Sequence, residues 1–218
     1  MATRQYAVIG LGRFGISVAR RLHEAGQQVL GIDINEARVE DAELFVTHAV
    51  VADSTEEDAL KSVGIRNFDR VIVAIGNDMQ SSILTVLLLK ELGVKKVIAK
   101  ALGTHHGKVL DKVGADWIIY PERDMGERVA NQLLSPNMLN YIELSTEYNI
   151  EEIIIPESMA EKSLREIDIR AKYNVSAIAL VRDGNVVISP SPDEIINKGD
   201  MLVLIGSRED LTEFSNIE

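Results

Sequence analysis

Apolar runs alternate with helix-like segments over the first half of the chain. Runs typical of buried strands cover residues 6–9, 29–32, 48–52, 69–75, 96–101 and 116–119. Between most of them, apolar positions repeat at helical spacing, over residues 14–25, 36–45, 79–92 and 105–113. Strands that alternate with helices in this way lie parallel, and six of them predict a doubly wound α/β sheet of the Rossmann type with strand order 3-2-1-4-5-6.

The alternation ends near Pro136. Just around it, residues 128–139 predict an extra helix whose apolar side we expect to be buried against a second copy of the chain. The remainder predicts a small α+β domain, with strands at 151–155, 176–182, 186–189 and 201–205 and helices at 161–166 and 208–214. Asp183-Gly184-Asn185 is a hairpin signal between two of these strands. We therefore predict a first domain over residues 1–135 and a second over 136–218, the second small enough that pairing with its own copy is expected.

A glycine loop, Gly10-Leu11-Gly12-Arg13-Phe14-Gly15, joins the first predicted strand to the first helix. In this pattern Gly10 permits the tight turn, Gly12 lets the backbone approach a pyrophosphate, and Gly15 lets the helix pack on the strand. The helix amino terminus favours the phosphate charge. Asp33 ends the second strand, where its carboxylate can accept hydrogen bonds from both hydroxyls of an adenosine ribose. A glycine turn needed only for packing leaves Asp33 unexplained, so the pattern predicts a nucleotide site.

Other candidates lie at the carboxyl ends of the next strands, the edge at which open α/β sheets bind ligands. Asp53 follows the third strand. The sequence supports equally that its side chain contacts the adenine of a nucleotide and that it does not. Ser54 and Thr55 need no more explanation than capping of the next helix. The tip formed by Ala74, Ile75 and Gly76 ends the fourth strand and should lie beside the glycine loop.

Two charged residues follow the same rule at later strands. Lys100, near the end of the fifth strand, is either a phosphate contact or a solvated surface lysine. Glu122 stands in Pro121-Glu122-Arg123-Asp124, just after the sixth strand. It is either an acid in the first turn of a helix, or a ligand that reaches a nucleotide phosphate through a metal ion, or part of a subunit interface.

Composition restricts the partners and the compartment. The 218 residues contain no cysteine, which excludes disulfides, thiolate metal sites and cysteine nucleophiles, and fits a reducing compartment. A formal net charge of −11 argues against nucleic acid and anionic membrane surfaces as partners. The longest apolar stretch, residues 83–89, is far shorter than the roughly 20 residues that span a bilayer. We expect a cytosolic protein without direct membrane insertion, for which a membrane-protein partner remains open.

The sequence contains no recognisable reaction centre. A nicotinamide-dependent dehydrogenase needs a second domain that supplies a general acid or base, and none of the four histidines lies after residue 106. The chain is therefore expected to be a nucleotide sensor and not an enzyme. The alternative is an NAD(H)-binding redox sensor or oxidoreductase of similar fold.

The motifs themselves resemble a known family. The glycine loop, Ala52-Asp53-Ser54-Thr55, Val73-Ala74-Ile75-Gly76 and Pro121-Glu122-Arg123-Asp124-Met125-Gly126 are similar to those of the cytosolic regulatory subunits of Ktr potassium transporters, which are RCK (KTN) proteins. The resemblance implies a Rossmann domain that binds ATP or ADP, with NAD(H) also a ligand of relatives, and a C-terminal RCK_C domain that binds cyclic di-AMP. It also implies dimers that assemble into an octameric ring on a membrane-embedded potassium transporter subunit, at the inner face of the cell membrane.

The resemblance also assigns roles by position. In the first domain Arg13 would reach the terminal phosphate, Asp33 the ribose, Asp53 and Ser54 the adenine, and Glu122 a cation (Mg, Ca or monovalent) near the γ-phosphate. An arginine adds most where a ligand carries the extra charge of a γ-phosphate, which supports the role of Arg13 independently. The nucleotide set is completed by Gly10, Gly12, Phe14 and Gly15 of the loop, by Ala74, Ile75 and Gly76 of the tip, and by Lys100 and Arg123.

For the second domain the resemblance implies a cyclic di-AMP site. Arg170 would meet a phosphate, with Leu164, Ile167, Val175 and Pro190 around the bases. Asn174 and Ser176 depart from the relatives, which often have Gly and Asn at these two positions, and the shorter hydroxyl of Ser176 loses reach toward a base. From composition alone, a salt bridge with Asp168 or Glu166 explains Arg170 better than an anion site does.

Overall fold

The computed structural model describes residues 3–134 and 138–217, with the backbone alone for 138–141. The chain divides into two compact units, Met1–Asp124 and Met125–Glu218. The division falls within one long helix, α6 (Pro121–Leu134). The domain boundary predicted at 135/136 lies outside the described residues and stays a prediction.

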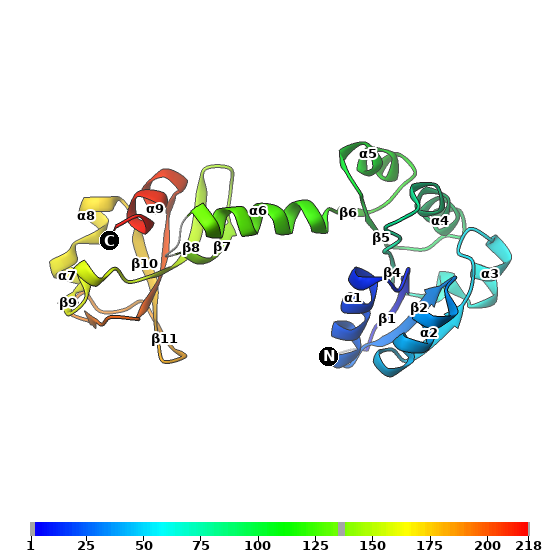
Figure 1. The fold of residues 1–218 in the computed structure, drawn as a ribbon, viewed down its shortest axis with the longest axis horizontal. Coiled ribbons are helices and arrows are strands. Elements are labelled where there is room, and N and C mark those ends of the chain that lie inside the picture. Colours follow the sequence, from blue (N-terminus) through cyan, green and yellow to red (C-terminus); the bar gives the residue numbers. More distant parts are fainter. Residues whose placement is uncertain (1–2, 135–137, 218) are drawn as a thin grey trace. The chain divides into compact units, whose positions relative to one another are not determined.

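The first unit is the predicted doubly wound sheet. Six parallel strands pair in the order β3-β2-β1-β4-β5-β6, which confirms the predicted topology (Figure 1). The strands are β1 (Gln5–Ile9), β2 (Gln28–Asp33), β3 (His48–Val51), β4 (Arg70–Val73), β5 (Val97–Lys100) and β6 (Trp117–Ile119). The helices are α1 (Arg13–Glu24), α2 (Glu36–Ala42), α3 (Glu57–Ser62), α4 (Met79–Glu91) and α5 (Thr104–Lys112), with the 3-10 turns η1 (Glu43–Phe45) and η2 (Ile65–Asn67).

Both faces of this sheet are covered, because the strands are apolar on both sides. One core contains Ile9, Ile32 and Val73 with residues of α3, α4 and α5. The core on the other face contains Val8 and Ile72 with residues of α1 and α2. The carboxyl ends of the strands are left to the connecting loops, where the candidate site lies.

The second unit is an antiparallel sheet with helices, as predicted. Five strands pair in the order β11-β10-β13-β8-β7, beside a two-stranded sheet of β12 and β9. The elements after α6 are β7 (Met138–Glu143), β8 (Tyr148–Ile154), η3 (Glu157–Met159), β9 (Lys162–Ser163), α7 (Leu164–Ile167), α8 (Ile169–Tyr173), β10 (Ser176–Arg182), β11 (Asn185–Ile188), β12 (Ile195–Ile196), β13 (Met201–Ser207) and α9 (Arg208–Ser215). The predicted hairpin is confirmed: Asp183 and Gly184 both have positive φ, 49° and 77°, and Arg182 pairs with Asn185.

Three local predictions were wrong. The extra helix expected over residues 128–139 is helical to Leu134, residues 135–137 lie outside the described residues, and Met138 begins strand β7. The helix expected at 161–166 begins only at Leu164, because Ser163 and Glu166 form a capping box there. Ser54 and Thr55 do not cap α3, whose N-cap is Glu56.

Candidate functional site

The glycine loop has the geometry that the sequence predicts. Gly10 lies at φ 92° and its N–H donates to the Ile32 carbonyl at 2.8 Å. A Cβ on Gly15 would stand 1.8 Å from the Gly10 carbonyl oxygen, so this position admits only glycine. A Cβ on Gly12 would meet nothing within 4 Å. Packing therefore explains Gly10 and Gly15, while the open space at Gly12 leaves its predicted role at a pyrophosphate as a prediction.

Asp33 fastens the second strand to this loop. It is buried, and its Oδ2 accepts the N–H of Leu11 at 2.7 Å while Oδ1 accepts the N–H of Asn35 at 2.9 Å. Arg38, at 3.5 Å from Oδ2, is a neighbour that sequence reasoning missed. Each carboxylate oxygen has further lone pairs, so ribose hydroxyls can add to these bonds.

The end of β4 lies against the loop, as predicted. A Cβ on Gly10 would be 3.0 Å from both the Ala74 carbonyl carbon and the Ile75 nitrogen, and the Ala74 N–H donates to Ile9 at 2.7 Å. Gly76, which follows, is exposed. The carboxyl ends of β1 and β4 thus form adjacent walls, at the switch point where sheets of this kind bind ligands.

Lys100 is a buried member of this site and not a solvated surface lysine. Its exposed fraction is 7%. Its Nζ lies 2.5 Å from Glu122 Oε1, 5.7 Å from the Phe14 ring centroid, and 3.3 Å from the place of a Cβ on Gly76. The hydrogen bond from Lys100, together with the nearby Arg13 charge, holds the pKa of Glu122 below its ordinary value. Four segments distant in sequence therefore meet here.

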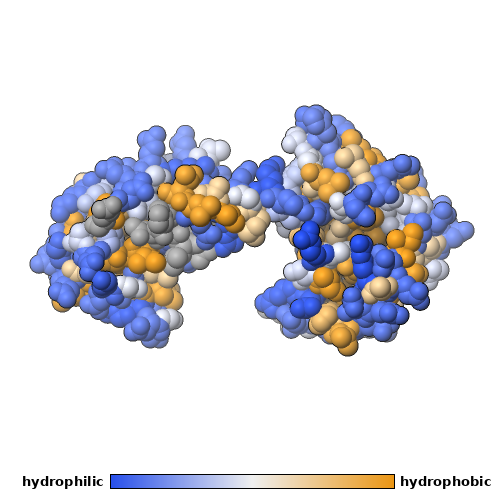
Figure 2. All heavy atoms as spheres, in the orientation of Figure 1, coloured by the Kyte–Doolittle hydropathy of each residue, from blue (hydrophilic) through white to orange (hydrophobic). Residues whose placement is uncertain are grey.

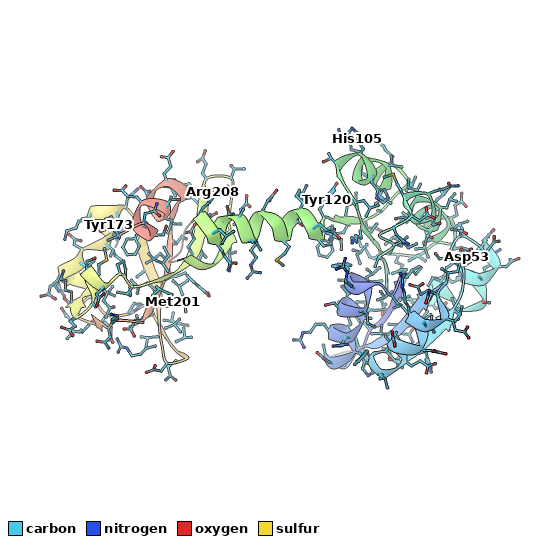
Figure 3. All side chains as sticks on the ribbon, in the orientation of Figure 1. Asp53, His105, Tyr120, Tyr173, Met201 and Arg208 are labelled. Carbon is cyan, nitrogen blue, oxygen red and sulfur yellow. The ribbon has the colours of Figure 1, made fainter. Side chains whose placement is uncertain are left out.

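Arg13 stands at the start of α1 with its side chain exposed. Within the described residues it forms no hydrogen bond or ion pair. Its positive charge contributes to lowering the pKa of Glu122. Arg123 pairs with Asp124 at 2.9 Å and covers the Tyr120 ring at 4.1 Å, and its predicted nucleotide contact stays a prediction. Figure 3 labels Tyr120 at the beginning of α6.

The residues after β3 are organised by internal hydrogen bonds. Asp53 Oδ1 accepts both the N–H and the hydroxyl of Thr55, at 2.9 and 2.7 Å. Ser54 is buried, and its hydroxyl lies 2.8 Å from that of Thr85 on α4. The Ser54 hydroxyl thus links the segment after β3 to α4 in the buried interior. The adenine contacts predicted for Asp53 and Ser54 stay predictions.

His106 supports the segment after Lys100, a role that the sequence did not reveal. Its Nδ1 accepts the N–H of Leu102 at 3.2 Å. Burial lowers the pKa of His106, which keeps the ring neutral and able to accept this bond.

The cation predicted at Glu122 stays a prediction. Along the stretches that the structure describes, no group of three His, Cys, Asp or Glu side chains is arranged to hold a metal ion. The Glu122 carboxylate is bonded to Lys100 instead. Mg can bind through one carboxylate when phosphate oxygens and waters complete its coordination shell, so a cation at Glu122 would depend on a bound nucleotide.

The six residues predicted to bind cyclic di-AMP lie in the second unit, but their side chains differ in exposure to solvent. Leu164, Ile167 and Val175 are buried in its hydrophobic core and are held by packing. Arg170 on α8 is exposed and, among the described residues, forms no ion pair with Asp168 or Glu166. Ser176 and Pro190 are partly exposed.

The departure at Asn174 is accommodated. This residue has φ 54°, a left-handed conformation that glycine adopts freely and asparagine tolerates. Its Nδ2 also donates to Asp210 Oδ2 at 3.0 Å, which ties the end of α8 to α9.

A cavity of about 480 Å³ opens at the amino ends of β1, β2 and β3, beside Gln5, Gln28 and His48. It lies at the opposite end of the sheet from the glycine loop. Ligands of parallel sheets bind at the carboxyl ends, so the site remains the one built from the glycine loop, Asp33, Gly76 and Lys100.

These features define a class: a Rossmann domain with a dinucleotide-type glycine loop, followed by a small antiparallel α+β domain. None of the helices in the described parts of the chain has both the length and the apolar character needed to cross a membrane.

Comparison with known proteins identifies the family. Residues 6–121 match the TrkA-N domain and residues 150–218 match the TrkA-C domain. The chain is 48% identical over 213 residues to Ktr system potassium uptake protein A of Bacillus subtilis, covering 98% of this chain and 96% of that protein. It is 47% identical over 211 residues to Ktr system potassium uptake protein C of the same organism, covering 97% and 96%. The chain therefore belongs to the RCK family of Ktr potassium uptake proteins, as the motifs indicated.

Solved structures show the same fold. The GsuK RCK domain superposes with a TM-score of 0.66 at 17% identity, over 99% of this chain and 48% of that chain. The GsuK channel bound to NAD superposes with a TM-score of 0.57 at 25% identity, over 98% of this chain and 38% of that chain. The chain thus spans less than half the length of those proteins.

Proposed function

We propose that this chain is the cytoplasmic regulatory subunit of a Ktr-type potassium uptake system. Its first unit binds ATP or ADP, and the nucleotide switches a membrane-embedded potassium transporter subunit at the inner face of the membrane. The names of the relatives support potassium uptake. The observation that carries the nucleotide role is the exposed Arg13 guanidinium, which stands at the amino end of α1 beside the Lys100–Glu122 pair.

The arrangement offers a way to tell ATP from ADP. A ligand shifts a two-state assembly only by its difference in affinity for the two states. Backbone N–H groups of the loop and α1 serve any pyrophosphate. An arginine that reaches a phosphate absent from ADP supplies the difference. In this account the chain is not an enzyme, and it neither forms nor breaks covalent bonds of the nucleotide.

NAD(H) is the second candidate ligand. The GsuK channel was solved with NAD and has 25% identity to this chain. Asp33 suits the adenosine ribose of NAD as well as that of ATP. A strong preference for NADH over ATP in thermal-shift titration, or turnover of NADH with a small substrate, would favour a redox sensor or an oxidoreductase.

The Arg13→Ala variant tests the nucleotide role. We expect it to weaken ATP about tenfold or more and ADP much less, because one charge-assisted contact is worth about 1.5–3 kcal/mol. Asp33→Ala is the matched control and should weaken both nucleotides alike. Isothermal titration measures all four affinities. Equal losses of ATP and ADP in Arg13→Ala would remove the role of Arg13 at the γ-phosphate.

We also propose that the second unit binds cyclic di-AMP through Arg170. Its guanidinium is exposed in a region where Lys172 adds a second positive charge. Arg170→Ala should abolish cyclic di-AMP binding in titration and leave ATP affinity unchanged, with Arg165→Ala, whose guanidinium pairs with Asp193 at 2.8 Å, as the control. Retained binding in Arg170→Ala would show that the site is elsewhere.

We further infer a homo-oligomer of dimers that close into an octameric ring. Supporting this, α6 exposes Met125, Val129 and Leu133, with exposed fractions of 55%, 46% and 78%. Figure 2 shows hydrophobic surface near the carboxyl end of this helix. Exposed apolar side chains on one helix favour burial against a second copy. A Mg, Ca or monovalent cation at Glu122 remains part of the proposal, and Glu122 would have to leave Lys100 to hold it.

A further inference from the structure

The Lys100 ammonium group has one anionic partner in the described residues, and it lies where a phosphate tail would arrive. Lys100 is buried at 7% exposure, and its Nζ contacts Glu122 Oε1 at 2.5 Å. The same nitrogen stands above Gly76, next to the glycine loop. An ammonium group buried to this extent needs an anion beside it, because transfer out of water penalises its charge.

Glu122 is a weak competitor for this position. Its side chain is 68% exposed, so water screens its attraction for Lys100 and can solvate the carboxylate once it is released. A di- or triphosphate carries more negative charge than one carboxylate, and the loop would hold it on backbone donors. A phosphate tail at Lys100 would lie beside the Glu122 carboxylate, and repulsion between the two negative groups favours one of them at this position.

We propose that Lys100 is exchanged between Glu122 and the phosphate tail of the nucleotide. Glu122 then selects for ligands whose phosphate tail carries enough negative charge to displace it, and the displacement changes the contacts at the start of α6. This inference rests on the proposed nucleotide function and deepens it. Glu122 lies in the first turn of α6, which begins in the first unit and continues into the second. Nucleotide binding therefore releases a carboxylate at the start of α6, within which the two units divide.

The exchange makes a counterintuitive prediction for Glu122→Gln. In EDTA, where no divalent cation takes part, the variant should bind ADP about three- to tenfold more tightly than the natural chain, because the competitor for Lys100 is gone. A carboxylate that served the nucleotide only as a metal ligand would give no change in EDTA. Asp124→Asn is the control, since Asp124 is exposed in the same helical turn but pairs with Arg123.

A double-mutant cycle separates exchange from simple repulsion. Isothermal titration of the full chain with ADP in EDTA compares Glu122→Gln, Lys100→Met and the double variant, with Lys100→Gln in place of Lys100→Met if the latter does not fold. The exchange predicts that Glu122→Gln has no effect once Lys100 is removed. An equal gain in both backgrounds, or no gain in the natural background, overturns the exchange. Absence of ADP binding by the natural chain would contradict the proposed function instead.

Discussion

Two glycines of one loop meet different requirements at the scale of the single residue. A methyl group at Gly15 would penetrate the Gly10 carbonyl, at 1.8 Å, whereas a methyl group at Gly12 would point into open space. The first glycine is needed to fold the loop, and the second is available to bring the backbone close to a ligand.

This difference gives a paired prediction. Gly15→Ala should lower the free energy of unfolding by about 1–3 kcal/mol or more, because the loop backbone must move. Gly12→Ala should leave the free energy of unfolding within about 0.5 kcal/mol and weaken ATP and ADP together. Urea unfolding and nucleotide titration measure the two effects. A stable Gly15→Ala, or a Gly12→Ala with unchanged affinity, would contradict this separation of roles.

The positions of residues were predictable where they follow from local sequence. The glycines and Asp33 are defined by their spacing within one βαβ unit. Lys100 and Ser54 are not, because Glu122 lies 22 residues from Lys100 and Thr85 lies 31 residues from Ser54. Both contacts depend on which loops the sheet brings together. The interpretation of Lys100 as a solvated surface lysine and the prediction that Ser54 caps a helix were therefore wrong.

At the scale of the element, β8 contains an unusual buried acid. Glu151 is 5% exposed, and Asn149 Nδ2 donates to it at 3.2 Å. Burial raises the pKa of Glu151 above the ordinary 4.5, against the opposing effects of Asn149 and the Arg208 charge. Arg208 itself, labelled in Figure 3 at the start of α9, pairs with Glu143 of β7 at 2.9 Å.

Stability should therefore depend on pH through this group. The unfolded chain loses the Glu151 proton near pH 4.5 and the folded chain at a higher pH, so the free energy of unfolding falls as pH rises through that window. Glu151→Gln should flatten this slope and raise stability at about pH 7 by roughly 1 kcal/mol, as a charge with few partners is removed. Urea unfolding from about pH 4.5 to 7 tests this, with exposed Glu147→Gln as the control. A variant less stable than the natural chain at neutral pH would contradict it.

Elements were predictable where periodicity is strong. Hydrophobic pattern was enough for the six parallel strands and the Asp183-Gly184 hairpin. It failed around β7, because Met138 and Leu139 continue the apolar spacing of α6 although Pro136 separates them from the helix. Pairing with β8 is a contact with later sequence, which periodicity does not contain.

At the scale of the whole molecule, the proposal joins the nucleotide site to subunit arrangement. The chain shares 48% identity with a potassium uptake protein over nearly its full length, and its exposed α6 side chains suit contact with another copy. In this proposal Arg13 and Lys100 contact the phosphate tail of the ligand, and α6 connects these contacts to the second unit.

Small-angle X-ray scattering of the purified chain, with saturating ATP and then with saturating ADP, tests this claim most directly. We predict that both nucleotides bind with comparable affinity and give assemblies of different shape at the same subunit number, and that Arg13→Ala makes the ATP curve approach the ADP curve. Superimposable curves for the natural chain with the two nucleotides would contradict the account.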